Sequence, residues 1–451
     1  MQRFDAAIVG AGPAGGSLAT LLARAGWSVA LIERQAFPRR KVCGECIAAT
    51  NLPLLDALGV GRVLRERAGA ELRRVALWRG DADLVAALPR AEGAAPYGRA
   101  LGREHLDTLI ADAAEAAGAT RLQPWALRDL AGTPGAYRLR LAATGAPGAQ
   151  RAEPVPRGDG AGTAHAAGEP VDRAEAPAAG ESRDIEIEAG LVVAAHGSWE
   201  PLPSERAARR ATRRPSDLFA FKANFRDAAL AHDLLPVLAF PGGYGGMVVA
   251  DDGIATLACC IREDALERAR SAAARDGGGA AARAGSAVEA LLRRECRGVA
   301  AALGPAHRAG SWLASGPIRP GVRLGQGDGV FRIGNAAGEA HPIVGEGISM
   351  ALQSAFLLAS LIGSRRRELV GTDAATVQRR ALAGYEARWR ERFARRLQVA
   401  AAFAHVAMRP WAASLAWPAV ARWPGVLTHG ARWSGKTRCA PEAAALAATL
   451  G

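Results

Sequence analysis

The feature that most constrains this chain is a glycine-rich turn near its start, Gly10-x-Gly12-x-x-Gly15. In such a turn the first glycine makes the tight bend, and the second lets a pyrophosphate approach the backbone. The third lets the following helix pack closely against the preceding strand. Glycines are common in this chain, which has 53 of them, so the motif counts only if its surroundings also fit.

The segments around the turn do fit. An apolar run over 5–9 predicts a strand, a small-residue segment from Pro13 predicts a helix, and a second apolar run over 29–32 ends at Glu33. The amino terminus of the helix attracts phosphate, and an acid at the end of the second strand can bond a ribose hydroxyl. Residues 4–33 are therefore expected to form the first unit of a dinucleotide-binding domain.

Composition limits what else the chain can be. Its 451 residues are enough for two or three domains, and 49% apolar with 22% charged residues is typical of a globular protein. We find no run of about 18 apolar residues and no room for a signal peptide before the first strand, so we expect a cytoplasmic protein. The net charge of +13 comes without a basic, aromatic-interleaved module, so we expect no nucleic-acid partner.

The loop that follows the first unit contains a Cys-x-x-Cys pair, Cys43 and Cys46. Zinc needs about four ligands and no second pair is present, so we expect no metal site. The six cysteines also lack the spacing of a disulfide framework. We expect the loop to lie against the face of the cofactor, with Cys43 as a small wall residue.

Several further elements follow from periodicity. We expect a helix over 52–68, strands over 72–77 and 83–88, and a helix that Arg103 opens and Gly118 ends. Strands are expected over 137–142 and 184–188. The tract 144–182 between them has almost no large apolar residue, so we expect a disordered insertion.

A second domain is predicted from about Asp217. The segment 218–226 alternates, with Phe219, Phe221 and Phe225 on one side, and these rings are candidates for a wall of the substrate site in either reaction. Further strands are expected over 237–240, 247–250 and 254–261, with a glycine-rich turn over 241–246. Together these strands predict an antiparallel sheet, followed by helices over 263–305.

Two features stand near the end of the chain. A strand over 330–333 leads into Gly334-Asn335, and Pro342-x-x-Gly345-Glu346-Gly347 opens an apolar helix. A polar turn followed by glycines at the start of a helix suits a ligand that has a chain of hydroxyl groups and a ring that gains negative charge.

The segment 376–407 predicts a basic amphipathic helix. We expect its apolar stripe to pack on the body; the alternative is a lid or a membrane-facing surface. The stripe consists of Leu382, Tyr385, Trp389, Phe393 and Leu397.

With these motifs in view, most of residues 4–365 resembles the flavoprotein monooxygenases of p-hydroxybenzoate hydroxylase type and their geranylgeranyl-reductase-like relatives. The first glycine motif with Glu33 resembles their adenosine and pyrophosphate site. Arg103 with Asp107 resembles their arginine helix, and the motifs at 334–335 and 342–347 resemble their second flavin motif. The strings around Cys43 and His196 resemble oxidoreductases that accompany type III polyketide synthases. The resemblance implies FAD as resident cofactor and NAD(P)H as a transient electron donor.

The resemblance also implies a fold and a set of site residues. The fold is α/β, with a GR2-type Rossmann-like FAD-binding domain, an antiparallel substrate-domain sheet and a helical C-terminal tail. We place the FAD-binding domain at 1–72, 101–200 and 316–365, the substrate domain at 73–100 and 201–315, and the helical region at 366–451. The expected cofactor-binding residues are Gly10, Gly12, Pro13, Ala14, Gly15, Glu33, Arg34, Cys43, Arg103, Gly334, Asn335, Pro342, Gly345, Glu346, Gly347 and Ile348.

The resemblance implies that the protein hydroxylates a hydrophobic phenolic substrate through a flavin C4a-hydroperoxide. The reductase alternative saturates an isoprenoid double bond, and Gly246, where such reductases often carry Trp, speaks against it. Asn335 and His196 replace the usual aspartates, which leaves a degenerate, non-catalytic flavin binder as a third interpretation. Halogenation is discounted because the Trp-x-Trp-x-Ile-Pro motif is absent. No general base is assigned; Lys222, His196 and His341 are candidates by residue type.

Overall fold

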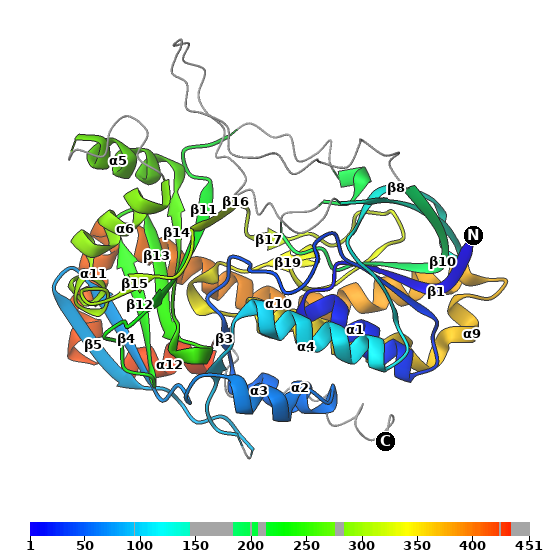
Figure 1. Ribbon diagram of the computed structural model, residues 1–451, viewed down its shortest axis with the longest axis horizontal. Coiled ribbons are helices and arrows are strands. Elements are labelled where there is room, and N and C mark those ends of the chain that lie inside the picture. Colours follow the sequence, from blue (N-terminus) through cyan, green and yellow to red (C-terminus); the bar gives the residue numbers. More distant parts are fainter. Residues whose placement is uncertain are drawn as a thin grey trace, which may run out of the picture.

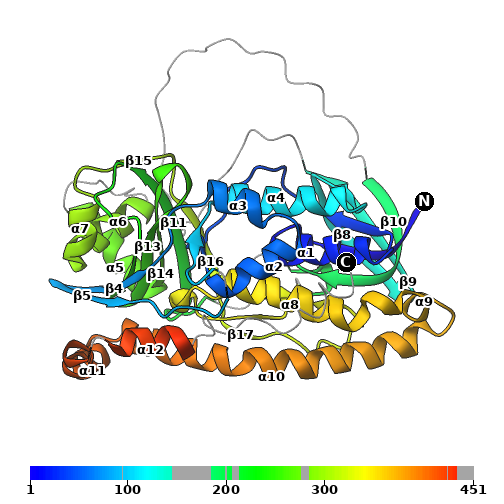
Figure 2. The same ribbon diagram turned by 90° about the horizontal axis from the view of Figure 1, so that it is seen from below.

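The computed structural model describes residues 1–93, 95–144, 184–198, 201–205, 213–275, 284–423 and 425–433. Except for residue 144, the predicted insertion lies outside these residues. The described chain forms two large sheets, each covered by helices, two short sheets of two strands, and one long helix that runs along both large sheets (Figures 1 and 2). The predicted fold class is therefore confirmed.

The first sheet has seven strands and carries the glycine turn. Its order is β7-β2-β1-β10-β9-β8, with β18 beside β10. The strand β1 is parallel to β2 and β10, whereas β9 is antiparallel to both of its neighbours. The strands are β1 (Gln2–Val9), β2 (Val29–Ile32), β7 (Thr120–Leu122), β8 (Trp125–Thr133), β9 (Ala136–Ala143), β10 (Asp184–Ala194) and β18 (Phe331–Arg332).

Three helices pack together beside this sheet: α1 (Pro13–Arg24), α4 (Arg103–Ala116) and α8 (Gly347–Ile362). The contact of α1 with α4 is close, because a Cβ on Gly16 would lie 2.7 Å from the Ile110 side chain. All four residues of β2 are buried, as expected for a parallel strand covered on both faces.

The second sheet has eight strands and lies beside the first (Figure 1). Its order is β15-β11-β14-β13-β12-β4-β5, with β16 paired to β11. All of its pairings are antiparallel except that of β12 with β4. The strands are β4 (Arg74–Arg79), β5 (Ala82–Ala87), β11 (Leu218–Arg226), β12 (Leu234–Phe240), β13 (Gly243–Val249), β14 (Ala255–Arg262), β15 (His307–Arg308) and β16 (Leu313–Ile318).

One face of the second sheet packs against the helices α5 (Glu263–Ala273), α6 (Ala284–Glu295) and α7 (Arg297–Ala302). The rings of Phe219, Phe221 and Phe225 belong to this core and do not line the cavity, so these candidates for the substrate wall are not supported. Alternate residues of β11 point to opposite faces, and the opposite face carries Ala220 and Lys222 instead. Both faces are buried, which explains why the pattern alone did not say which one faces the site.

Two predicted elements differ in detail. The single helix expected over 52–68 is two helices, α2 (Leu52–Ala57) and α3 (Gly61–Arg67), because Gly59 adopts a left-handed conformation with φ of 83°. The glycine-rich segment 241–246 is not wholly a turn, since β13 begins at Gly243. A Cβ on Gly245 would lie 2.6 Å from the Ala258 carbonyl oxygen, so these glycines let the strands approach closely.

The C-terminal region is helical, as predicted. It contains α9 (Arg366–Leu369), α10 (Ala374–Met408), α11 (Pro410–Arg422) and α12 (Gly425–Trp433). The helix α10 has 35 residues and runs beneath both sheets (Figure 2). The Tyr385 hydroxyl donates to the Arg332 carbonyl, 2.8 Å away, and the Trp389 side chain packs against Gly338. Tyr385, Trp389, Phe393 and Leu397 of the predicted stripe are buried. Those four side chains are therefore unavailable to a lipid surface.

One stretch of the described chain, Gly347–Leu369, is long and apolar enough to cross a membrane. The expectation that no such stretch exists is therefore wrong on composition. Most of this stretch is α8, and 72% of its apolar window is buried inside the protein. It is the central helix of the first core.

Candidate functional site

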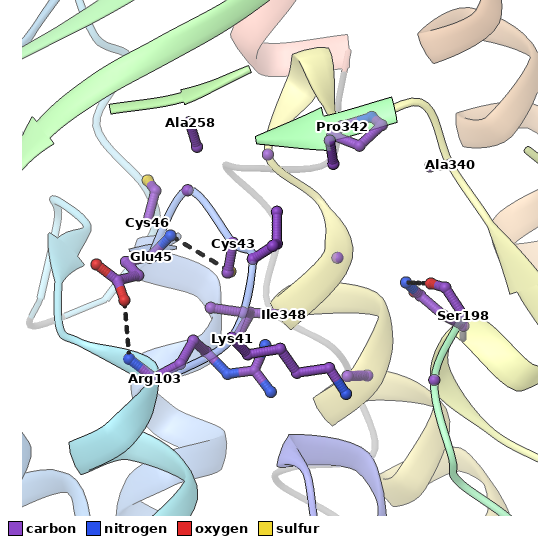
Figure 3. Close-up of a pocket in the computed structure, with 18 of the residues that line it drawn as sticks. Lys41, Cys43, Glu45, Cys46, Arg103, Ser198, Ala258, Ala340, Pro342 and Ile348 are labelled. Carbon is purple, nitrogen blue, oxygen red and sulfur yellow. Dashed lines mark hydrogen bonds between the residues drawn. The ribbon is translucent and has the colours of Figure 1, made fainter. Parts of the chain in front are cut away.

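A cavity extends from the glycine turn to the second sheet (Figure 3). The cavity volume is about 260 Å³. Its lining joins the glycine turn to the strands of the second sheet, so a ligand held at the turn can extend towards that sheet.

The glycine turn is built as its spacing predicts. Gly10 has φ of 108°, and a Cβ there would lie 2.5 Å from the Ala195 carbonyl oxygen. A Cβ on Gly15 would lie 1.8 Å from the Gly10 carbonyl oxygen, so helix and turn are in direct contact. Gly12 differs, because the nearest atom to its Cβ position is a guanidinium nitrogen of Arg103, 3.6 Å away. The backbone at Gly12 is therefore open towards the cavity and Arg103.

The first turn of α1 has no side-chain cap, and Pro13 stands at its start. Its orphan N–H groups and the positive end of the helix dipole are available to an anion. The guanidinium of Arg103 is held by both carboxylate oxygens of Asp107, at 2.7 and 2.8 Å. This carboxylate raises the pKa of Arg103 despite burial, so the side chain is a fixed cation beside the turn.

Glu33 and Asp107 are joined by a residue that sequence reasoning missed. Arg39 bonds the Glu33 carboxylate at 3.2 Å and pairs with Asp107 at 3.1 Å, and all three side chains are buried. Glu33 also accepts the N–H of Ala11, 3.1 Å away. The network fixes the acid at the end of β2 relative to the arginine helix. Only the run of basic residues at 39–41 could have indicated Arg39.

The second motif forms the other side of the cavity. The Gly334 N–H donates to the Ser354 hydroxyl at 2.8 Å, and the Asn335 amide donates to Ser198 at 2.9 Å. Gly345 has φ of 64°, and a Cβ on Gly347 would meet no atom within 4 Å. The start of α8 therefore offers open backbone to a ligand, as α1 does.

The structure brings most of the predicted cofactor-binding residues together around this cavity. Those that line it are Gly10, Gly12, Pro13, Ala14, Glu33, Cys43, Arg103, Gly334, Asn335, Pro342, Gly345, Gly347 and Ile348. Gly15 lies behind the turn and Arg34 is half-buried outside the lining. Glu346 is buried and pairs with Arg396 of α10 at 3.7 Å, so it anchors the long helix.

The loop over residues 41–46 also lines the cavity, as expected for Cys43 (Figure 3). Its key residue was missed: Glu45 is buried and has φ of 58°. Its carboxylate accepts from the backbone N–H of Arg103 at 3.0 Å, from Thr256 at 2.5 Å, and from the ammonium of Lys222. These bonds hold the strained loop and connect the arginine helix to the second sheet.

The second sheet closes the cavity with an uncharged wall. The residues that it contributes are small or aliphatic, among them Ala220, Leu235, Val237, Gly246, Ala258 and Cys260. Lys222, a general-base candidate, is fully buried in its ion pair with Glu45 and is not part of the lining. The wall therefore favours a neutral, hydrophobic molecule.

Tyr244 of β13 places a polar group in this wall. Its hydroxyl lies 3.1 Å from Nδ1 of His341, and the ring centroid of His341 is 5.9 Å from that of His405 on α10. Burial raises the pKa of Tyr244, so the phenol is protonated at neutral pH. Burial and the neighbouring His405 lower the pKa of His341 to about 4, so this imidazole is neutral.

His196, the remaining general-base candidate, lies in the turn after β10. Its Nδ1 is 3.0 Å from the Gly197 carbonyl oxygen, and Nε2 is 3.7 Å from a Glu205 carboxylate oxygen. Gly197 has φ of 81°, and a Cβ there would lie 3.5 Å from the Lys41 ammonium. The turn lines the cavity, and His196 is held by its own neighbours.

Comparison with known proteins identifies the first part of the site. Residues 3–126 match the family model described as an FAD binding domain. A segment of 118 residues is 35% identical to menaquinone reductase of Mycobacterium tuberculosis. The segment covers 26% of this chain and 28% of that protein, so the chain matches just over a quarter of the relative's length.

Solved structures are similar over most of the chain. The myxobacterial chondrochloren halogenase CndH has a TM-score of 0.67 at 18% identity and covers 100% of this chain and 97% of its own. A geranylgeranyl bacteriochlorophyll reductase-like protein from Thermoplasma acidophilum has a TM-score of 0.63 at 15% identity, over 88% and 86% of the chains. At these identities the likeness establishes the fold.

The fold and the site define a protein with an FAD-binding domain. The resemblance drawn from the sequence is confirmed: the chain carries an FAD-binding domain and shares the fold of FAD-dependent halogenases and reductase-like flavoproteins. The residues present fit FAD, because Gly12 and Gly347 leave open the two positions that a Cβ would fill. Arg103 and the uncapped start of α1 complement a pyrophosphate.

Proposed function

We propose that the protein is an NAD(P)H-dependent monooxygenase that uses FAD to hydroxylate a hydrophobic phenolic substrate. The observation that carries the proposal is the continuity of the cavity from the cofactor cradle to an uncharged wall with the phenol of Tyr244 in it. A neutral aromatic ring fits such a wall, and a substrate hydroxyl can bond Tyr244.

Arg103 and the uncapped start of α1 would hold FAD, which would supply hydride acceptance from NAD(P)H and the activation of oxygen. The chain supplies orientation and a dry environment. The apolar wall would exclude water from the reacting ring of the substrate. Arg103 and the start of α1 would bind the phosphate end of FAD and so fix its orientation.

Tyr244 and His341 would also accept the proton of a substrate phenol and pass it on. The Tyr244 oxygen accepts the substrate O–H while its own O–H donates to Nδ1 of the neutral His341. His405 is exposed on α10 and its ring centroid is 5.9 Å from that of His341, so the proton would reach solvent through His405. An ionised phenol is richer in electrons and therefore easier to hydroxylate.

The second candidate is a reductase that saturates a double bond of an isoprenoid chain. The identity of one segment to menaquinone reductase favours it. In that reaction Tyr244 would donate a proton to the substrate instead of accepting one.

The experiment that separates the two supplies purified protein with NAD(P)H and a long-chain phenol or a prenylated quinone. We expect oxygen uptake that matches NAD(P)H oxidation, and a product heavier by one oxygen atom. Turnover without oxygen, with a product heavier by two hydrogens, would establish the reductase instead. A protein that binds FAD but oxidises NAD(P)H neither with these substrates nor without them would support the non-catalytic interpretation.

A further inference from the structure

Exposed apolar side chains gather at one end of the molecule. Of the nine large hydrophobic residues that are exposed in the described chain, six lie between the end of α10 and α12. We call them the apolar patch: Phe403, Val406, Trp411, Leu415, Trp423 and Val426. In Figure 2, α11 and α12 stand at the end of α10, below β4 and β5.

The helix α11 has two large apolar side chains on the outside. Trp411 is 69% exposed and Leu415 is 77% exposed, one turn apart on the same face, whereas the small Ala413 points inward. A helix that only covers the protein body shows the reverse arrangement. Burial within this chain therefore does not account for the choice of side chains on α11.

The orientation of α11 and α12 is fixed by bonds to the second sheet. Arg79 of β4 donates to the Ser414 hydroxyl at 2.7 Å and lies over the ring of Trp417. Thr428 of α12 donates to the Ala87 carbonyl of β5, also at 2.7 Å. The outer face is therefore presented by anchored helices.

The charged residues of this segment of the sequence have one sign. The sequence contains no Asp or Glu between Glu391 and Glu442. Arg409, Arg422 and Arg432 are exposed beside the apolar patch. A basic rim around exposed Trp and Leu side chains is complementary to the headgroups and upper acyl region of an anionic bilayer.

A second copy of the chain fits this surface less well. A twofold interface would place the same patch against itself, and the arginines would face each other without an acidic partner in this segment. Anionic lipid supplies the negative charge that a copy of this segment lacks.

The patch is also next to the cavity. On α10, Phe403 and Val406 face outward, whereas Ala404 and Met408 pack against Ala220 and Tyr244 of the cavity wall. The Met408 carbonyl accepts the Gly242 N–H at 3.0 Å. One layer of helix therefore separates the patch from the substrate wall.

We infer that the end of α10, with α11 and α12, is a docking surface for an anionic lipid membrane. Trp411, Leu415 and Trp423 insert into the headgroup region, and the three arginines bind lipid phosphates. Docking holds the substrate wall beside the bilayer, from which a hydrophobic substrate can be drawn. The surface does not depend on which reaction the cavity performs.

The test is flotation of the full-length protein with vesicles of phosphatidylcholine, with and without phosphatidylglycerol. We expect the protein to float with the anionic vesicles, and less so as salt is raised. Changing Trp411→Ser together with Leu415→Ser should lower the bound fraction roughly tenfold. Arg409→Gln with Arg422→Gln should remove the preference for phosphatidylglycerol. The control is Val322→Ser, an exposed apolar residue outside the patch, which should float like the wild type.

Failure of the wild type to float with either vesicle would overturn the inference, as would unchanged flotation of the Trp411 and Leu415 variant. A dimer in sedimentation velocity that this variant abolishes would also overturn it, because a second copy would then cover the patch. Flavin absorbance and melting temperature confirm that each variant is folded. Since flotation needs no turnover, its outcome is independent of the monooxygenase proposal.

Discussion

The carboxylate of Glu45 and the ammonium of Lys222 form an ion pair that is buried between the two sheets. Glu45 belongs to the loop beside the cofactor cradle, and Lys222 belongs to β11 of the second sheet. Since Glu45 also accepts the first N–H of the arginine helix, one carboxylate connects three parts of the site.

Breaking this pair from one side should destabilise the protein strongly. Glu45→Gln leaves the Lys222 charge buried without its counter-ion, which costs about 3–5 kcal/mol in comparable pairs. The double change Glu45→Gln with Lys222→Met removes both charges and should cost less than Glu45→Gln alone. Urea denaturation measures the free energy of unfolding of both variants. A double variant that is less stable than the single variant would contradict the argument.

The glycine turn predicts two different phenotypes. Gly12→Val should abolish FAD binding yet leave the apoprotein folded, because its Cβ points to the cavity and Arg103. Gly15→Ala should lower stability with or without FAD, because its Cβ would overlap the Gly10 carbonyl. Flavin absorbance per protein and the melting temperature distinguish the two, with Gly384→Val on the outside of α10 as the control. A folded Gly12→Val protein with full flavin content would refute the assignment.

Glu33 should matter for affinity and for folding. In Glu33→Ala the loss of a hydrogen bond to the ribose should weaken FAD binding by about 1.5–3 kcal/mol, or roughly 10–150-fold. The same change removes the partner of Arg39 and of the Ala11 N–H, so we expect a lower melting temperature as well. Titration of the apoprotein with FAD and a thermal melt measure the two effects. Unchanged affinity would remove Glu33 from the cofactor site.

The position of His341 predicts a pH dependence of stability. Its pKa is about 4 in the folded protein, below the ordinary value of about 6.5. The unfolded chain therefore binds a proton between these values while the folded protein does not, and the stabilisation present above about pH 6.5 is lost as the pH falls towards 4. The urea midpoint should drop between about pH 7 and pH 5, and His341→Gln should reduce this drop. If the urea midpoint drops equally in the variant and the wild type, groups other than His341 cause the pH dependence.

Tyr244→Phe tests the proton path. The variant keeps the ring and should keep its FAD, but turnover should fall by a factor of about 10² to 10⁴, as for loss of a general acid or base. A purely structural role would leave the pH profile unchanged, whereas the proton path predicts that the variant loses the dependence on His341. Normal turnover in Tyr244→Phe would exclude the path.

The sequence predicted the parts of this molecule that depend on local pattern. The strand, turn and helix over 4–33, the helix from Arg103 and the second glycine motif are all found, because glycine spacing and apolar periodicity act within one segment. The long helix was predicted over 376–407 and spans Ala374–Met408. The expected disordered insertion at 144–182 stays a prediction, because residues 145–183 are outside the described chain.

Features that depend on pairing between distant segments were missed. Nothing in the string around Glu45 shows that it will meet Lys222, 177 residues later, because that contact is set by how the two sheets pack. The Tyr244 and His341 pair is of the same kind, because its members are 97 positions apart in the sequence. The phenylalanines of β11 were assigned to the wrong face, since both faces of the strand are apolar.

The long helix α10 constrains how this molecule can move. It is bonded to the first half through Tyr385 and Arg332, and to the second through Met408 and Gly242. A hinge-like opening of the two halves would have to bend α10 or break one of these attachments. We therefore expect the distance between the two sheets to stay constant. Substrate then enters by movements of loops and side chains at the cavity mouth, without a rigid-body separation of the domains.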